Sequence, residues 1–332
     1  MKPLSKCVLF TLIFVLAVSA CIFTCSNKPV TTANPQYVKW MEFNATEKAL
    51  VKAMEYDIAT NADDYPISWI DILAYAAAKN GNNFKNDKLK SMDDFVNLIK
   101  NGSSVEDITK DMKYFSYYKQ TYSAVLGEFL GDYEITPPDS DTPVKKYGLK
   151  AFLPIADGYG YSHYSDFGSS RSYGFKRKHL GNDLLGSIGT PITAVESGTV
   201  EALGWNRYGG WRIGIRSFDK KRYYYYAHLK KDSPYAKGLK QGDKVNAGDV
   251  IGFLGMTGYS TRENVNNINI PHLHFGMQII FDESQKDGNN EIWIDVYDIV
   301  NLLGRNKSTV IRSDDGNYKR KYFFNDIENS GD

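Results

Sequence analysis

The segment His272-Leu273-His274-Phe275-Gly276-Met277-Gln278-Ile279-Ile280 decides the fold of this chain. Side chains in a β-strand alternate between two faces, so apolar residues at every second position mark a face that enters a core. The apolar positions here are Leu273, Phe275, Met277 and Ile279. His272, His274 and Gln278 then share the opposite face. The alternation therefore predicts a strand that holds two imidazoles within reach of one metal ion.

Other short segments with the same period precede this one, and glycines separate them. The predicted strands are Ile192–Val195, Thr199–Leu203, Trp211–Phe218, Arg222–Leu229, Val250–Leu254 and His272–Ile280. Many short strands joined by glycine-containing turns are typical of an antiparallel sandwich or barrel-like domain. We therefore predict a mainly antiparallel β domain over residues 149–303.

Residues 40–132 show a helical period instead. Apolar residues recur at every fourth position in Leu50, Met54 and Ile58. Ser68 and Ser91 are helix-start signals, because an acidic residue follows each of them three positions later. A further helix is predicted from about Val105 to Leu130. This region is expected to be a small helical bundle that packs, spaces or binds a partner, since the sequence singles out no carboxylate pair of the kind a lysozyme-like enzyme needs.

Two polar segments complete the predicted organisation. Residues 133–148 contain three prolines among Asp, Ser and Thr, a composition typical of a linker. Residues 304–332 are polar and charged and are predicted to be an appended tail. The predicted fold class is α+β, with an N-terminal helical bundle followed by the antiparallel β domain.

Residues 1–25 have the pattern of an export segment. Lys2 and Lys6 precede an uncharged run, as in a secretory signal or membrane anchor. The run contains Val18-Ser19-Ala20-Cys21, which resembles a bacterial lipobox with Cys21 as the lipidated residue. The alternatives are an uncleaved membrane anchor and a buried helix. Both the lipidated form and the uncleaved anchor predict an extracytoplasmic protein that is attached at the outer face of the cytoplasmic membrane of a bacterium.

Composition limits the chemistry that is available. The chain has 40 basic and 39 acidic residues and a formal net charge of +1, which gives no electrostatic case for nucleic acid as a partner. Its three cysteines all lie at or before position 25, so the exported part has no thiolate ligand or nucleophile. Any metal site there must use His, Asp or Glu. The five histidines all lie at or after position 163.

Three motifs contain four of those histidines. Besides the His-x-His pair, residues 179–183 place an imidazole and a carboxylate four positions apart, and His228 lies in the predicted tyrosine-rich strand Arg222–Leu229. By alternation, His228 is predicted to share a face with Tyr224 and Tyr226. Each histidine alone has a structural explanation, but two imidazoles and one carboxylate make a zinc site with an open catalytic position. Two further histidines beside it can accept a proton and stabilise an oxyanion.

Taken in order, His-x-x-x-Asp, Tyr-x-His-Leu and His-x-His resemble the lysostaphin-type (LytM-like) zinc endopeptidases of bacterial cell walls. The flanks agree, with Phe167-Gly168 and Arg171 before the first motif and Gly248-Asp249-Val250-Ile251-Gly252 before the last. The resemblance covers about residues 150–303. It implies a lysostaphin-like β domain, a duplicated hybrid-type sandwich, behind the helical region.

The resemblance also implies roles for individual residues. His179, Asp183 and His274 match the positions that hold one zinc ion, and His228 and His272 match those that act on substrate and water. The implied substrate is a peptide of peptidoglycan, cut in its stems or cross-bridges, and an envelope protein is a further expected partner. The alternative is a catalytically silent wall-binding or complex-forming scaffold on the same fold, although such a scaffold has little reason to retain all five positions.

The chain departs from the family pattern in two places. Asn182 stands where an aliphatic residue is usual, and Arg262–Ile270 is inserted before the last motif. We expect the insertion to form a loop at the rim of the active site. His163 lies outside the motifs, with either a substrate contact or a packing role.

Overall fold

The computed structural model describes residues 37–85, 88–172, 176–288, 290–314 and 316–326. The chain divides into two compact units, Met1–Tyr37 and Val38–Asp332, and the elements named below belong to the second. The predicted export segment, residues 1–25, lies outside the described residues. None of the helices in the described ranges combines the length and the apolar character that crossing a bilayer requires.

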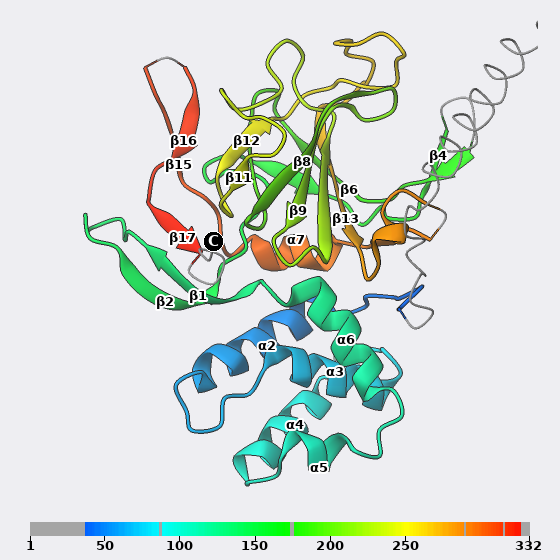
Figure 1. The fold of residues 1–332 in the computed structure, drawn as a ribbon, viewed down its shortest axis with the longest axis vertical. Helices are drawn as coiled ribbons and strands as arrows, with labels where there is room; N and C mark the ends of the chain where they lie inside the picture. Colours follow the sequence, from blue (N-terminus) through cyan, green and yellow to red (C-terminus); the bar gives the residue numbers. More distant parts are fainter. Residues whose placement is uncertain (1–36, 86–87, 173–175, 289, 315, 327–332) are drawn as a thin grey trace, which may run out of the picture. The chain divides into compact units, whose positions relative to one another are not determined.

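The N-terminal part of the second unit is helical, as predicted (Figure 1). Its helices are α2 (Glu47–Thr60), α3 (Trp69–Asn80), α4 (Lys90–Lys100), α5 (Val105–Thr109) and α6 (Phe115–Leu126). Ser68 caps α3, because its hydroxyl oxygen accepts a hydrogen bond from the Ile70 amide at 3.2 Å. The start signal at Ser91 was wrong, since Ser91 lies inside α4 and its hydroxyl donates to the Lys88 carbonyl at 2.7 Å.

The predicted helix from Val105 to Leu130 is instead two helices, α5 and α6. Between them, the amide of Met112 donates to the Thr109 carbonyl at 2.9 Å and the amide of Phe115 donates to the Met112 carbonyl at 3.2 Å. These bonds span three residues rather than four, so the chain tightens into turns and the α-helical ladder is interrupted.

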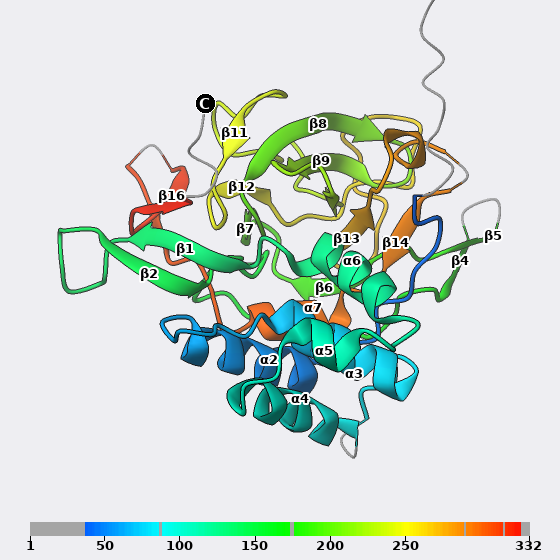
Figure 2. The same cartoon turned by 60° about the horizontal axis from the view of Figure 1, so that its bottom comes forward.

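The β domain is built from short antiparallel strands, which confirms the predicted class (Figures 1 and 2). Its largest sheet has the order β11-β8-β9-β10-β13-β6-β3, with β14 also paired to β13. The members of this sheet are β3 (Tyr161–His163), β6 (Asn182–Gly186), β8 (Gly198–Asn206), β9 (Gly210–Ser217), β10 (Arg222–Ala227), β11 (Lys244–Val245), β13 (His272–Ile279) and β14 (Ile292–Ile294). Smaller ladders join β7 (Pro191–Thr193) to β12 (Val250–Phe253) and β4 (Ser170–Ser172) to β5 (Lys176–Lys178).

Strand β13 has the two faces that its sequence predicts. Its apolar residues are completely buried: Leu273, Phe275, Met277 and Ile279. Phe275 packs against Tyr224 and Tyr226 of β10, with ring centroids 6.3 and 5.3 Å apart. The core therefore occupies one side of the sheet and leaves the histidine side of β13 open for a site. Helix α7 (Tyr297–Leu303) follows β14, and its apolar residues belong to the same core.

The segments predicted as linker and tail contribute strands to a separate three-stranded sheet and to one further hairpin. Strands β1 (Leu130–Ile135) and β2 (Val144–Leu149) form a hairpin, and β17 (Phe324–Asp326) pairs with β1. The prolines of residues 133–148 lie between β1 and β2, where no ladder hydrogen bond needs their missing N–H. In the tail, β15 (Val310–Arg312) and β16 (Tyr318–Arg320) form a second hairpin. The described part of residues 304–332 therefore contains three strands, one of which pairs with β1.

Aromatic and ionic contacts hold the three-stranded sheet in place. Phe324 of β17 packs against Tyr133 and Phe152, with ring centroids 5.4 and 5.2 Å apart. The buried ammonium of Lys150 lies 3.0 Å from the Asp326 carboxylate. These contacts join residues far apart in sequence, so composition alone cannot predict them.

A buried arginine joins the helical part to the large sheet. Arg222 of β10 is completely buried and forms two hydrogen bonds to Glu196, at 2.7 and 2.9 Å. Its Nη1 donates to the carbonyl of Ala124 in α6 at 2.7 Å. One guanidinium group thus satisfies a carboxylate and a helix end at the same time, and it fixes α6 against the sheet.

Candidate active site

Three predicted ligand residues converge on one point. Nε2 of His179 lies 2.7 Å from Nδ1 of His274 and 3.1 Å from Oδ1 of Asp183. Nδ1 of His274 lies 3.3 Å from the same Asp183 oxygen. The described residues contain this one cluster with metal-ligating geometry. The structure thus brings together, from separate motifs, the residues that the sequence pairs with zinc.

The sheet register and one glycine produce this convergence. His274 of β13 is paired directly with Asp183 of β6, so both side chains leave the sheet on the same face. His179 precedes β6 in a loop that passes very close to β13. A Cβ atom on Gly181 would lie 2.5 Å from the Phe275 carbonyl oxygen and 2.9 Å from the His274 ring, so only glycine permits the approach.

Asp166 and Arg171 orient the ligand residues from behind, and their placement was not predicted. The main-chain oxygen of Asp166 lies 3.1 Å from Nδ1 of His179. Arg171 donates to Oδ2 of Asp183 at 3.0 Å and to Oδ2 of Asp166 at 2.8 Å. Because a carbonyl oxygen can only accept, Nδ1 of His179 carries the proton and its Nε2 lone pair faces the other ligands. The Phe-Gly-x-x-Arg flank was the only sequence signal for this arrangement.

His228 lies on the opposite face of the sheet from the one predicted. Tyr224 and Tyr226 are buried in the core, whereas His228 lines the site cavity with Tyr225. The physical reason is backbone conformation: His228 has φ 63°, in the left-handed region, so the alternation ends at Ala227. The strained conformation turns the imidazole toward His272 and His274, with ring centroids 4.8 and 5.9 Å from its own.

His228 and His272 present the same nitrogen to the cavity. Nδ1 of His228 lies 2.9 Å from the Thr257 carbonyl oxygen, and Nδ1 of His272 lies 2.8 Å from that of Ile270. Since both partners only accept, each Nδ1 donates a proton and each Nε2 keeps a free lone pair. Nε2 of His272 is 3.6 Å from the Asp183 carboxylate. Two proton-accepting nitrogens therefore lie beside the candidate ligands.

Burial and charge determine the protonation states in the cavity. Burial lowers the pKa of His228 well below its usual value, and the His272 and His274 rings lower it further. Burial also lowers the pKa of His274. For Asp183, burial raises the pKa, but the adjacent His179, His274 and His272 imidazoles outweigh it and lower the pKa of the carboxyl far below its ordinary range. An ionised carboxylate and neutral imidazoles are the forms in which these groups bind a metal ion.

The cavity around the site has a volume of about 270 Å³. Its aromatic and basic walls come from Arg171, Arg177, Tyr208, Tyr225 and Tyr259. Arg177 of β5 stacks on Tyr208 and Tyr259 and donates a hydrogen bond to the Tyr259 hydroxyl. The sequence had not singled out Tyr208, Tyr225 or Tyr259 for the site, because nothing in their spacing separates them from the many core tyrosines.

The two departures from the family pattern have structural explanations. Asn182 is completely buried, accepts a hydrogen bond from the Val296 amide at 3.1 Å and donates to the Tyr164 carbonyl at 3.2 Å. An amide at this position thus ties β6 to the start of α7. The insertion Arg262–Ile270 lies between Tyr259 and His272, which both line the cavity, and Asn267 donates to the Tyr259 carbonyl at 2.7 Å.

His163 has a packing position. Its ring stacks on Tyr297 with centroids 4.5 Å apart, and its Nδ1 lies 3.4 Å from Oδ1 of Asn301. It is not among the described residues that line the site cavity. The fifth histidine therefore supports helix α7 against β3.

Comparison of this sequence with known proteins finds similarity to the same peptidases that the histidine motifs resemble. The sequence model of Peptidase family M23 matches residues 177–289. The chain is 44% identical over 131 residues to the L-Ala--D-Glu endopeptidase of Bacillus subtilis, covering 39% of this chain and 38% of that protein. It is 40% identical over 119 residues to lysostaphin of Staphylococcus simulans, covering 36% of this chain and 20% of that protein.

A third curated relative is the peptidoglycan DD-endopeptidase ShyC of Vibrio cholerae, 29% identical over 161 residues, covering 47% of this chain and 31% of that protein. The chain thus spans less than two fifths of the length of these relatives.

A solved structure from Ruminococcus gnavus, named for the lytM glycyl-glycine endopeptidase, has a TM-score of 0.55 at 22% identity. The match covers 84% of this chain and 95% of that chain, so the likeness in fold extends over the helical region as well. The sequence matches, by contrast, are concentrated on the β domain, where the histidine motifs lie. Over residues 177–289, the β domain of this chain thus matches the sequence model of Peptidase family M23 and is similar to lysostaphin, and a helical region precedes it.

Proposed function

We propose that this chain is a zinc-dependent endopeptidase that hydrolyses peptide bonds in peptidoglycan, in stem peptides or cross-bridges. The observation that carries the proposal is the convergence of His179, Asp183 and His274 in one cavity with two further histidines. The curated relatives are named for cleavage of different bonds, L-Ala--D-Glu in one and a DD-peptide bond in another. Family membership therefore supports the class of reaction and leaves the bond open.

The donor set fits zinc. A tetrahedral zinc ion with bonds of about 2.0–2.1 Å separates its ligand atoms by about 3.3 Å. The three ligand atoms here are separated by 2.7, 3.1 and 3.3 Å. Two neutral imidazoles and one carboxylate leave one position free for water or substrate, as in catalytic zinc sites. When bound, the zinc ion would polarise the peptide carbonyl and acidify a water molecule.

His228 and His272 are proposed to move the protons. Each keeps an unprotonated Nε2 in the cavity, because its Nδ1 donates to a main-chain carbonyl. Either ring can therefore take the proton of the attacking water, and a ring that carries a proton can donate a hydrogen bond to the developing oxyanion. The low pKa of His228, which follows from its burial, keeps that ring ready as an acceptor at neutral pH.

The proposed location is the outer face of the cytoplasmic membrane. It rests on the pattern of residues 1–25, with attachment either through an uncleaved anchor or through a lipid on Cys21. Mass spectrometry of the membrane-bound protein separates the two: an intact Met1 contradicts lipidation at Cys21, whereas a mature chain that begins with a lipid-modified Cys21 supports it.

The central experiment is digestion of purified peptidoglycan by residues 26–332, with the fragments identified by mass spectrometry. We expect peptide fragments that disappear with a chelator and return when zinc is added. His272→Ala should retain zinc, measured by elemental analysis, and lose hydrolysis. His163→Ala is the matched control, because His163 lies outside the cavity. A zinc-loaded chain that releases no fragment would favour the silent scaffold instead.

A further inference from the structure

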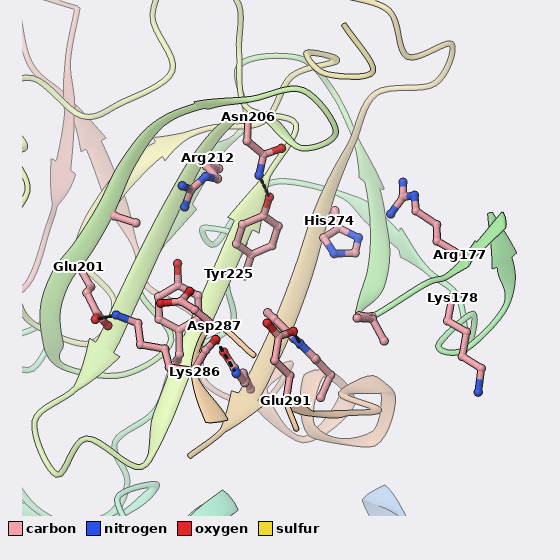
Figure 3. A pocket seen from close by; sticks show the side chains of 15 residues that line it. Arg177, Lys178, Glu201, Asn206, Arg212, Tyr225, His274, Lys286, Asp287 and Glu291 are labelled. Atoms are coloured by element: carbon pink, nitrogen blue, oxygen red, sulfur yellow. Dashed lines mark hydrogen bonds and ion pairs between the residues drawn. The ribbon is translucent and has the colours of Figure 1, made fainter. Parts of the chain in front are cut away.

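A second cavity adjoins the candidate active site on the same face of the sheet (Figure 3). Its volume is about 540 Å³, twice that of the site cavity. The two cavities share Arg177, Tyr225 and His274 in their linings. A peptide with one bond at the metal ligands can therefore extend an adjacent residue into this second cavity.

Strand alternation and one glycine form the cavity. On β9, Ile213 and Ile215 enter the core, so Arg212 between Trp211 and Ile213 faces the cavity. Trp293 of β14 forms part of the wall and packs edge-on against Tyr225, with centroids 6.2 Å apart. A Cβ atom on Gly276 would lie 2.9 Å from the Trp293 ring, so a glycine is needed there to admit it.

The cavity is lined by charged side chains of both signs. They are Arg177, Lys178, Arg212 and Lys286, with Glu201, Asp287 and Glu291. Some are already paired: Lys286 forms an ion pair with Glu201, and the Glu291 carboxylate accepts a hydrogen bond from the Trp293 indole at 2.7 Å. Figure 3 shows Arg212 and Asn206 on one side of Tyr225, and Asp287 and Glu291 on the other.

Arg212 carries a hydrogen-bond donor that the protein does not use. Its Nε is buried and has no hydrogen-bond partner within the described part of the chain. The guanidinium also forms a hydrogen bond with the Tyr223 hydroxyl, which does not neutralise its charge, because burial raises the pKa of that hydroxyl to about 12. A buried N–H without a partner is unfavourable, and a guanidinium binds a carboxylate through two parallel hydrogen bonds. The group therefore fits a carboxylate of a ligand.

We propose that this second cavity is the specificity subsite of the proposed peptidase, and that Arg212 binds a free carboxylate on the substrate residue next to the scissile bond. The inference rests on the proposed function. Asp287 and Glu291 repel additional negative charge, so the cavity fits one carboxylate on a peptide and not a polyanion. A chain of glycines offers no such group, and its hydrolysis gains nothing from Arg212.

The test compares two synthetic stem peptides in the zinc-loaded chain. One has a glutamate with a free carboxylate beside the cleavable bond, and the other has the same group as a primary amide. We expect a preference for the carboxylate form of about 10- to 100-fold in kcat/KM, the size of a charge-assisted hydrogen-bond pair. Arg212→Gln should lower kcat/KM more for the carboxylate form than for the amide form and so remove the preference, while Arg212→Lys should keep part of it.

The control and a second readout keep the outcomes distinct. Arg262→Gln replaces an exposed arginine outside both cavities and should preserve the preference. Binding of both peptides to His272→Ala, measured by calorimetry, reports the subsite without turnover. The subsite would be overturned if His272→Ala binds the two peptides equally and the native chain cleaves them equally. It would also be overturned if a folded Arg212→Gln protein loses the same fraction of kcat/KM on both peptides. Carboxylate-selective binding without hydrolysis in the native chain would support the subsite and contradict the peptidase.

Discussion

The main-chain oxygen of Asp166 lies 3.1 Å from Nδ1 of His179, and the Asp166 carboxylate lies 3.2 Å from the same nitrogen. A residue outside every histidine motif thus determines which nitrogen of His179 carries the proton. The Asp166 carboxylate also accepts from the Asp183 amide at 3.3 Å and from Arg171 at 2.8 Å. His179 and Asp183, the two candidate ligands nearest in sequence, are therefore oriented by the same side chain.

Asp166→Asn should weaken metal binding without unfolding the protein. The amide cannot hold Arg171 and His179 as the carboxylate does, and loss of such an outer partner typically lowers metal affinity about 10- to 100-fold. Competition with a chromogenic chelator measures the affinity. Asp157→Asn, an exposed aspartate earlier in the chain, is the matched control and should leave the affinity unchanged.

Gly181→Ala should disrupt the site through sterics alone. The added methyl group would lie 2.9 Å from the His274 ring and 2.5 Å from the Phe275 carbonyl oxygen, so the loop or β13 must move. We expect loss of zinc binding and of hydrolysis. Gly160→Ala adds the same methyl group where nothing lies within 4 Å, and it should behave as the unsubstituted chain. Full zinc affinity in Gly181→Ala would show that the close approach is not required.

Arg222→Met should strongly destabilise the second unit. Arg222 is completely buried against Glu196 and Ala124, so its removal leaves a buried carboxylate without its partner. Breaking a buried pair in this way costs about 3–5 kcal/mol. Urea unfolding followed by circular dichroism measures the loss. Arg305→Met removes an exposed pair with Glu47 and should cost only about 0–1 kcal/mol. A similar small cost for Arg222→Met would contradict the role assigned to this pair.

Acid should weaken the fold partly through Asp219. Burial raises the pKa of this carboxyl, but the Arg222 charge and a hydrogen bond from Ser217 outweigh it, and the net pKa is lowered. A carboxyl with a lowered folded-state pKa stabilises the fold above its unfolded pKa of about 3.9, and the stabilisation disappears as pH falls through the folded value. The free energy of unfolding of Asp219→Asn, measured from pH 7 to pH 3, should therefore fall less steeply at the acidic end. An unchanged slope would contradict this, and the exposed Asp141→Asn is the control.

The sequence by itself determined the features that depend on neighbours along the chain. The period-two pattern of β13 placed its apolar residues in the core and His272 and His274 on the other face, because strand alternation is a local property of the backbone. The hydroxyl cap of Ser68 on α3 is local in the same way. The order and spacing of the histidine motifs were enough to indicate the family.

Only the tertiary structure decided what depends on contacts between distant segments. The left-handed backbone at His228 turned that ring away from Tyr224 and Tyr226, which strand alternation cannot anticipate. Strand β17 of the predicted tail pairs with β1, which begins before the predicted linker. Hydrogen bonds between these strands and the contact of the Tyr133 and Phe324 rings join segments that are far apart in sequence. Contacts with remote loops also placed Asp166 behind His179, and they supply no partner for Nε of Arg212 among the residues that the structure describes. The free energies of these contacts depend on which groups are close together in the folded chain. The order of residues along the chain does not specify that by itself.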